Sequence, residues 1–158
     1  MNKILALVLS ILVSFGNVCD VDIPTTEKPE EFLLCGFTLE DIYEMANTLM
    51  IEAGGESYEG KQAVVATLIN RYNSSKYPNT IPEVIADGYS TKRAAVITQE
   101  CYDAVLWGIL HQDIFPEDMY WFRNKHYHAE VEGKRYNYIQ IGNHYFSTER
   151  NYNESLDV

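Results

Sequence analysis

The sequence predicts a mainly helical α+β fold with a small β-hairpin region near the C-terminus. Apolar residues recur at helical spacing from Leu39 to Ala53, and residues 63–69 are apolar nearly all round a helix, as in a helix buried at the centre of a domain. The aromatic run at residues 119–122 predicts a strand, and residues 130–141 predict a hairpin tip and a return strand. A chain of 158 residues is long enough for one domain with a substantial core.

The N-terminus has the pattern of an export signal. Lys3 precedes an apolar run, and Ser14-Phe15-Gly16 follows it as a cleavage site of the small-x-small type. The run is shorter than the roughly 20 residues that a membrane-spanning helix needs. We therefore expect a secreted or cell-envelope protein with no stable membrane span once the signal is cleaved. Its expected parts are a signal peptide at 1–16, a leader or linker at 17–36, the folded domain at 37–148 and a polar tail at 149–158.

Charge and cysteine content narrow the possible functions. The net charge of −11 argues against nucleic acid as a partner, because phosphates require a basic surface, but it does not exclude a sugar polymer. Three cysteines are present, and in an exported protein Cys35 could pair with either Cys19 or Cys101. Cys101 lies in an apolar helical pattern, which favours a small buried hydrophobic residue.

The first helix is the best defined element. Thr38 is placed to cap it, with Asp41 at the capping-box position, and Gly54-Gly55 predict a left-handed stop after Ala53. At about 100° per residue, Asp41, Glu44 and Thr48 face away from the apolar side of this helix.

The later elements follow in order along the chain. Ser57 is expected to cap a second helix, which runs roughly from residue 58 to 72. Thr80 and Pro82 predict a short helix that ends near residue 86. A further helix is expected from about residue 98 to 111, before the strand at 119–122. A turn at Gly142-Asn143 should then lead into residues 144–146.

Glu52 is the side chain most clearly suited to a catalytic role. It lies at the edge of the apolar face of the first helix and near that helix's C-terminus. Partial desolvation and the negative end of the helix dipole should both raise its pKa, as a general acid at neutral pH requires. The alternative is a glutamate at a helix end that simply reaches water. Glu56, just before the next helix, is a second catalytic candidate, or it holds the loop through backbone N–H groups.

Four ordered blocks of residues carry a resemblance to a known family. They are Glu52-Ala-Gly-Gly-Glu56, the Gly-x-x-Ala-Val to Asn-Arg pattern at 60–71, the Pro-x-Thr-Ile segment at 78–85, and Ile-Gly-x-His-x-Phe at 141–146. Together they resemble the cell-wall hydrolases typified by the spore cortex-lytic enzyme catalytic domain. The resemblance implies a fold like that of lysozyme and the lytic transglycosylases, peptidoglycan glycan strands as substrate, and Glu52 as the catalytic acid. The family's Asp-Pro-Thr-Gly-Gly-Ala turn is replaced here by residues 113–118.

The resemblance leads to a functional hypothesis. The chain should be an exported enzyme that cleaves the bond between N-acetylmuramic acid and N-acetylglucosamine, as a lytic transglycosylase or a muramidase, without a metal or other cofactor. Glu52 would act as acid and then base, with Glu56 in support. A hydrolase would need a second carboxylate about 5–9 Å away, whereas a transglycosylase uses the C6 hydroxyl of the muramic acid as its nucleophile.

Aromatic residues and one histidine are candidates for sugar binding. Tyr89, Tyr120, Trp121 and Phe122 could stack on sugar rings or pack in the core, and strand alternation would place Tyr120 and Phe122 on one face and Trp121 on the other. His144 is a further substrate-binding candidate, or it makes a structural hydrogen bond beside Gly142. Two other functions stay open: a non-catalytic glycan-binding module, and a zinc amidase that uses His126, His128 and His144.

Overall fold

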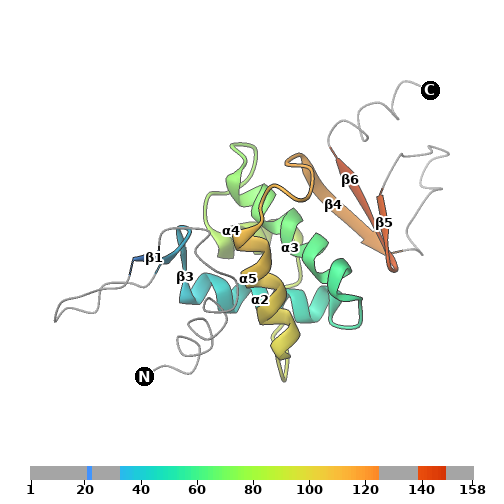
Figure 1. Cartoon of the computed structure of the whole chain (residues 1–158), viewed down its shortest axis with the longest axis horizontal. Coiled ribbons are helices and arrows are strands. Elements are labelled where there is room, and N and C mark those ends of the chain that lie inside the picture. Colours follow the sequence, from blue (N-terminus) through green and yellow to red (C-terminus); the bar gives the residue numbers. More distant parts are fainter. Residues whose placement is uncertain (1–20, 23–32, 125–138, 149–158) are drawn as a thin grey trace.

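A computed structural model of the chain describes residues 21–22, 33–124 and 139–148, and within them helices make up most of the regular structure (Figure 1). The helices are α2 (Leu39–Ala53), α3 (Tyr58–Asn73), α4 (Ile81–Gly88) and α5 (Gln99–Leu110). The strands are β1 (Val21–Asp22), β2 (Leu33–Leu34), β3 (Phe37–Thr38), β4 (Met119–Asn124), β5 (Ile139–Ile141) and β6 (His144–Thr148). No helix in the described part of the chain is long and apolar enough to cross a membrane. The predicted α+β class, mainly helical, is confirmed.

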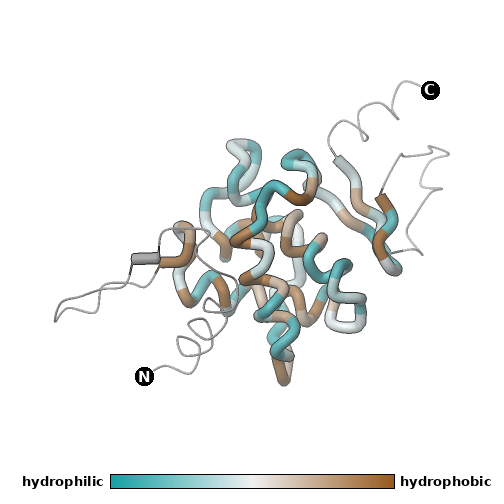
Figure 2. Tube along the Cα trace, viewed as in Figure 1, coloured by the Kyte–Doolittle hydropathy of each residue, from teal (hydrophilic) through white to brown (hydrophobic). Residues whose placement is uncertain are grey.

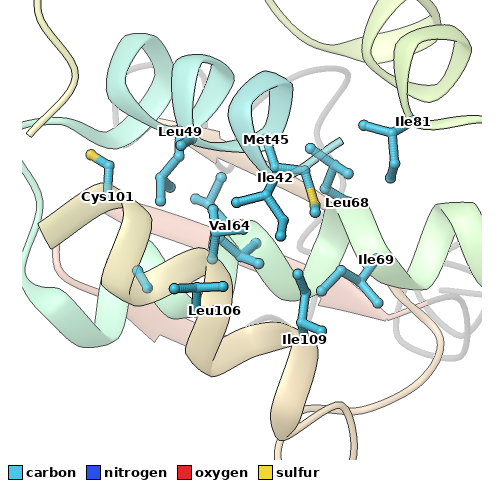
Figure 3. Packing of buried hydrophobic residues seen from close by; sticks show 14 of the residues in the cluster. Ile42, Met45, Leu49, Val64, Leu68, Ile69, Ile81, Cys101, Leu106 and Ile109 are labelled. Carbon is cyan, nitrogen blue, oxygen red and sulfur yellow. The ribbon is translucent and has the colours of Figure 1, made fainter. Parts of the chain in front are cut away.

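Helices α2, α3 and α5 meet around the hydrophobic core (Figure 3). Figure 2 shows hydrophobic and hydrophilic segments alternating along the helices, as expected when each helix has one buried side. A Cβ on Gly108 of α5 would lie 2.6 Å from Cγ1 of Val65 on α3, so this close helix contact depends on a glycine. The core side chains in Figure 3 each contribute about 1.5–3 kcal/mol by burial, and they include Ile42, Met45, Leu49, Val64, Leu68, Ile69, Leu106 and Ile109.

Helix α2 begins as the sequence predicts and ends differently. Thr38 Oγ1 accepts a hydrogen bond from the Asp41 N–H at 3.0 Å, and the Thr38 N–H donates to Asp41 Oδ2 at 2.9 Å, which completes the capping box. Gly54 has φ −55° and ψ −31°, so the predicted left-handed stop is wrong. A Cβ there would lie 2.5 Å from the Met50 carbonyl oxygen, and the glycine therefore serves close packing.

The polar side of α2 is covered by another segment. Thr48 and Asn47 are only 1% and 3% exposed, so α2 is also buried at positions outside its apolar arc. The segment before α5 covers Asn47 through its backbone: Asn47 Nδ2 donates to the Lys92 carbonyl, and the Ala94 N–H donates to Asn47 Oδ1, each at 2.9 Å. Arg93 of the same segment forms an ion pair with Glu44 at 2.7 Å.

The N-terminal strands bring part of the expected linker against the core. Strands β2 and β3 pair through a tight turn in which Cys35 (φ 49°) and Gly36 (φ 88°) both adopt left-handed conformations, and Leu34 and Phe37 are buried. Cys35 is disulfide-bonded, whereas Cys101 is a free, buried thiol that contacts Met50 Sδ at 3.7 Å. The alternative pairing of Cys35 with Cys101 is therefore excluded, and burial of Cys101 is confirmed.

The second sheet, of strands β4 to β6, lies at the opposite side of the helices from β1 and β3 in Figure 1. Its order is β4-β6-β5, so β6 pairs with both neighbours. The predicted turn at Gly142 and Asn143 is confirmed, and Gly142 has φ +60°. The register of β4 against β6 shifts between Met119 and Trp121. The predicted hairpin tip at 130–135 lies outside the described residues.

Candidate active site

Glu52 stands in the last turn of α2, beside a cleft between the helices and the second sheet. Its carboxyl group is partly exposed, and its Oε1 accepts a hydrogen bond from the Ser90 N–H at 2.7 Å. This bond orients the carboxyl from the segment that follows α4. The cleft has a volume of about 430 Å³, and the residues that line it are Glu52, Arg71, Gly88, Trp121, Phe122, Arg123, Asn124 and His144.

The aromatic residues of β4 are distributed differently from the predicted alternation. Trp121 and Phe122 both line the cleft. Tyr120 is buried and does not line the cleft; its ring lies 5.2 Å from the ring of Tyr77 and 5.7 Å from that of Trp121. The irregularity in β4 lies between Met119 and Trp121, whereas Trp121 to Asn124 pair with β6 in regular register, so it affects the direction of Tyr120 but not the alternation of Trp121 and Phe122. The expectation that Tyr120 and Phe122 share a face opposite Trp121 is therefore wrong.

His144 lies at the start of the central strand β6 and faces the same cleft. It is 5% exposed, and its ring packs edge-to-face on Phe122 with 5.0 Å between ring centroids. Its Nδ1 is buried and has no hydrogen-bond partner among the described residues. A buried nitrogen without a partner costs free energy, and because this atom is enclosed by the protein, a ligand in the cleft would reach it only after the ring moved.

Tyr89 lies behind the cleft wall and not in its lining. Its hydroxyl shares a hydrogen bond with Thr67 Oγ1 at 2.9 Å, and its ring lies 6.0 Å from that of Phe122. Burial raises the pKa of Tyr89 to about 12, so the phenol is neutral at physiological pH. Tyr89 is therefore placed to support the ring of Phe122 and not to contact a substrate directly.

Glu56, the second predicted carboxylate, is directed to the β5–β6 turn. It accepts hydrogen bonds from the Asn143 N–H at 3.0 Å and from Asn143 Nδ2 at 3.1 Å, and it does not line the cleft. A Cβ on Gly142 would collide with Glu56 Oε2, so a glycine is required for this approach. Glu56 therefore connects the start of α3 to the strand that carries His144.

This contact predicts a pH-dependent contribution to stability. Burial raises the pKa of Glu56, but the two hydrogen bonds from Asn143 and the charges of His144 and Lys61 outweigh it and hold the pKa below 4.5. The ionised form is thus favoured in the folded state, and its stabilisation is present above pH 4.5 and lost as the pH falls through the folded-state pKa. Wild type should exceed Glu56→Gln in unfolding free energy by about 1 kcal/mol or less, because the group is solvent-accessible. Urea titrations at pH 7 and pH 3 should show this difference shrinking; a constant difference would contradict the assignment.

Sequence reasoning missed several residues of the cleft: Arg71, Gly88, Arg123 and Asn124. Arg71 offered a signal, because a cation at the end of a nearly all-apolar helix needs a buried partner or a function. Ser90, which holds Glu52, gave no such signal. His126 and His128 of the zinc alternative lie outside the described residues.

Comparisons with known proteins identify relatives of this chain among spore cortex-lytic enzymes. The spore cortex-lytic enzyme of Bacillus subtilis is 35% identical over 95 residues, which cover 55% of this chain and 30% of that protein. The corresponding enzyme of Oceanobacillus iheyensis is 48% identical over 50 residues, or 32% of this chain and 18% of that protein. The chain thus spans less than a third of the length of these curated relatives.

Two solved structures share the fold. The catalytic domain of the Bacillus cereus SleB protein matches with a TM-score of 0.57 and 28% identity, covering 72% of this chain and 93% of that domain. The catalytic domain of the germination-specific lytic transglycosylase SleB from Bacillus anthracis matches with a TM-score of 0.58 and 27% identity, covering 73% and 100%. The sequence model of the family described as Cell Wall Hydrolase matches residues 55–147. The chain therefore belongs to the cell wall hydrolase family.

Proposed function

We propose that this chain is an exported enzyme that cleaves the glycan strands of peptidoglycan between N-acetylmuramic acid and N-acetylglucosamine. The proposal depends on the position of the Glu52 carboxyl group. This group lies at a cleft lined by aromatic rings, and the Ser90 N–H holds it there by a hydrogen bond. The similarity to spore cortex-lytic enzymes and to a lytic transglycosylase supports the same reaction.

Glu52 has the attributes of a general acid that later acts as a base. The Ser90 N–H occupies Oε1, which leaves Oε2 to carry a proton toward the glycosidic oxygen. As the bond between the anomeric carbon and that oxygen breaks, the proton moves to the leaving sugar and an oxocarbenium-like centre develops. The resulting carboxylate then takes the proton of the C6 hydroxyl, whose oxygen bonds to the anomeric carbon. The product ends in a 1,6-anhydro ring, and no water is consumed.

The carboxylate count favours this intramolecular route over hydrolysis. A retaining or inverting hydrolase needs a second carboxylate across the glycosidic bond. Among the residues described, the cleft lining contains one carboxylate, Glu52, while Glu56 is engaged by Asn143. Glu56 is then a positioning residue for the β5–β6 turn and not the second catalytic group.

Trp121, Phe122 and His144 are suited to hold the sugar. Sugar C–H faces stack on aromatic rings, and both rings line the cleft. The ring of His144 also lines the cleft and would contact the glycan beside Phe122.

Digestion of purified peptidoglycan followed by mass spectrometry of the soluble muropeptides tests the proposal. We expect products that end in 1,6-anhydro-muramic acid and are lighter by one water molecule than reducing products. Reducing ends would replace the transglycosylase route with hydrolysis. Binding without release of any muropeptide would indicate a glycan-binding module, and release of stem peptides from intact strands would indicate an amidase.

A further inference from the structure

The wall of the Glu52 cleft has the opposite charge from the rest of the protein. The chain as a whole contains 12 lysines and arginines against 23 aspartates and glutamates. The cleft lining in the described residues contains two arginines, Arg71 and Arg123, against the single carboxylate of Glu52. Basic groups gathered at one cleft of an acidic protein produce a local positive potential there.

Arg71 is fixed in this wall by contacts on three sides. It is 8% exposed, its Nε donates to the Tyr120 carbonyl at 2.8 Å, and its guanidinium lies 4.9 Å from the ring of Tyr77 and 5.1 Å from that of Tyr89. Asp87 lies 3.7 Å from NH1, but this carboxylate is half-exposed and screened by solvent. The guanidinium is therefore held in one orientation, and its only ion-pair partner among the described residues is this half-exposed carboxylate.

Gly88 allows that guanidinium to reach the cleft. A Cβ at Gly88 would collide with NH1 of Arg71, and Gly88 itself lines the cleft. Any other residue at position 88 would push the guanidinium back or cover its edge. Arg123 extends the positive wall from β4; it is exposed and makes no ion pair with a residue in the described ranges.

The chemistry of the reaction determines what these cations can do. The transition state of glycosidic cleavage is oxocarbenium-like and positive, so nearby arginines do not stabilise it. Arginine binds carboxylates in bidentate geometry and stays protonated. The carboxylates of peptidoglycan belong to muramic acid, either on its lactyl group or on the stem peptide attached to that group.

We propose that Arg71 and Arg123 bind a carboxylate carried by the muramic acid side of the substrate and so select anionic strands over neutral ones. This inference rests on the proposed function. A purely structural Arg71 would account for its tyrosine contacts but not for the second arginine on the same wall. The two residues are specificity determinants, and the proton transfers stay with Glu52.

Binding to the Glu52→Gln variant tests this selection separately from turnover. Soluble glycan strands are titrated while the intrinsic fluorescence is followed, which comes from Trp121 in the cleft and from Trp107 on α5. One set of strands keeps its carboxylates, and a second has them converted to methylamides with carbodiimide and methylamine. Anionic strands should bind about tenfold more tightly, and the difference should fall as salt is raised. Strands stripped of stem peptides keep only the lactyl carboxylate, so their affinity shows which of the two carboxylates is bound.

Matched arginine variants complete the test. Arg123→Gln should reduce the preference for anionic strands about threefold, since its charge is exposed. Arg71→Gln should nearly abolish this preference. Arg71→Lys should restore part of the preference, because it keeps the positive charge. Arg93→Gln removes the same charge from an arginine outside this cleft and should leave the preference unchanged. Equal affinity for anionic and neutral strands, or equal effects of Arg123→Gln and Arg93→Gln, would overturn the inference while the proposed function still stands. Absence of muropeptide release by the wild type would overturn the proposed function instead.

Discussion

Replacing Glu52 with glutamine should reduce the turnover of peptidoglycan about a thousandfold while the protein stays folded and still binds glycan. General acid–base catalysis by one positioned side chain contributes about 10²–10⁴ in rate. Glutamine keeps the shape of the side chain, and its carbonyl can still accept the Ser90 N–H, but it cannot deliver a proton. The measurement is the initial rate of muropeptide release, with thermal unfolding as the check on folding.

Two further variants make the Glu52 result specific. Glu59→Gln removes one carboxylate from an exposed position in the first turn of α3 and should leave the rate within about twofold of wild type. Glu56→Gln should keep most of the turnover, because Glu56 contacts the β5–β6 turn and not the cleft. If Glu56→Gln lost as much activity as Glu52→Gln, Glu56 would be the second catalytic carboxylate and the route would be hydrolysis. Retention of a tenth or more of the wild-type rate by Glu52→Gln would refute the assignment of the acid.

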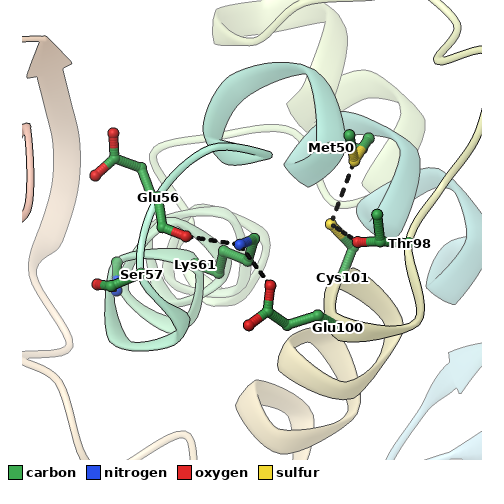
Figure 4. Close-up of polar contacts among 8 residues, drawn as sticks. Met50, Glu56, Ser57, Lys61, Thr98, Glu100 and Cys101 are labelled. Atoms are coloured by element: carbon green, nitrogen blue, oxygen red, sulfur yellow. Dashed lines mark hydrogen bonds and ion pairs between the residues drawn. The ribbon is translucent and has the colours of Figure 1, made fainter.

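Replacing Lys61 with methionine should lower the unfolding free energy by about 3 kcal/mol. Lys61 is 2% exposed, and its Nζ donates to the Glu56 carbonyl and to Glu100 Oε2, both at 2.7 Å (Figure 4). Methionine preserves the packing of the long side chain but leaves that carbonyl without its donor. A loss of this size corresponds to a fall in Tm of roughly 10 °C for a domain of this length.

The partner of Lys61 provides the matched control for this prediction. Glu100 is half-exposed, so Glu100→Gln leaves an acceptor that water can also satisfy, and it should cost less than about 1 kcal/mol. Urea unfolding monitored by circular dichroism measures both variants under the same conditions. Equal costs for the two variants would show that the pair acts as a surface ion pair and that the buried carbonyl contact contributes nothing.

Local patterns in the sequence were sufficient to predict the helices and the mainly helical class. The Thr38 cap, the Ser57 cap and the apolar run of α3 each depend on neighbours a few residues apart, and the structure has all three. The burial of Asn47 was not predictable in this way, because the segment that pairs with it, around Ala94, has no periodicity of its own. Helical periodicity indicates which side of a helix is apolar but cannot show that a loop covers the other side.

The candidate site likewise depends partly on local sequence patterns and partly on contacts between residues far apart in the sequence. Glu52 could be chosen as the acid from its place on α2, but its bond to Ser90 joins residues 38 positions apart. The bond of Glu56 to Asn143 spans 87 positions, and no local pattern predicts it. The cleft wall was mispredicted in one further respect, because Trp121 and Phe122 both line it although they are successive residues of β4.

The central place of β6 in its sheet has a consequence for the order in which the protein is made. Glu52 and its helix are synthesised early, whereas β6, which pairs with both β4 and β5 and carries His144, emerges almost last. A nascent chain released before residue 144 would hold the acid and β4 but lack His144 and the strand that pairs with β4. Nascent and truncated chains should therefore be harmless to the polymer that the finished protein attacks.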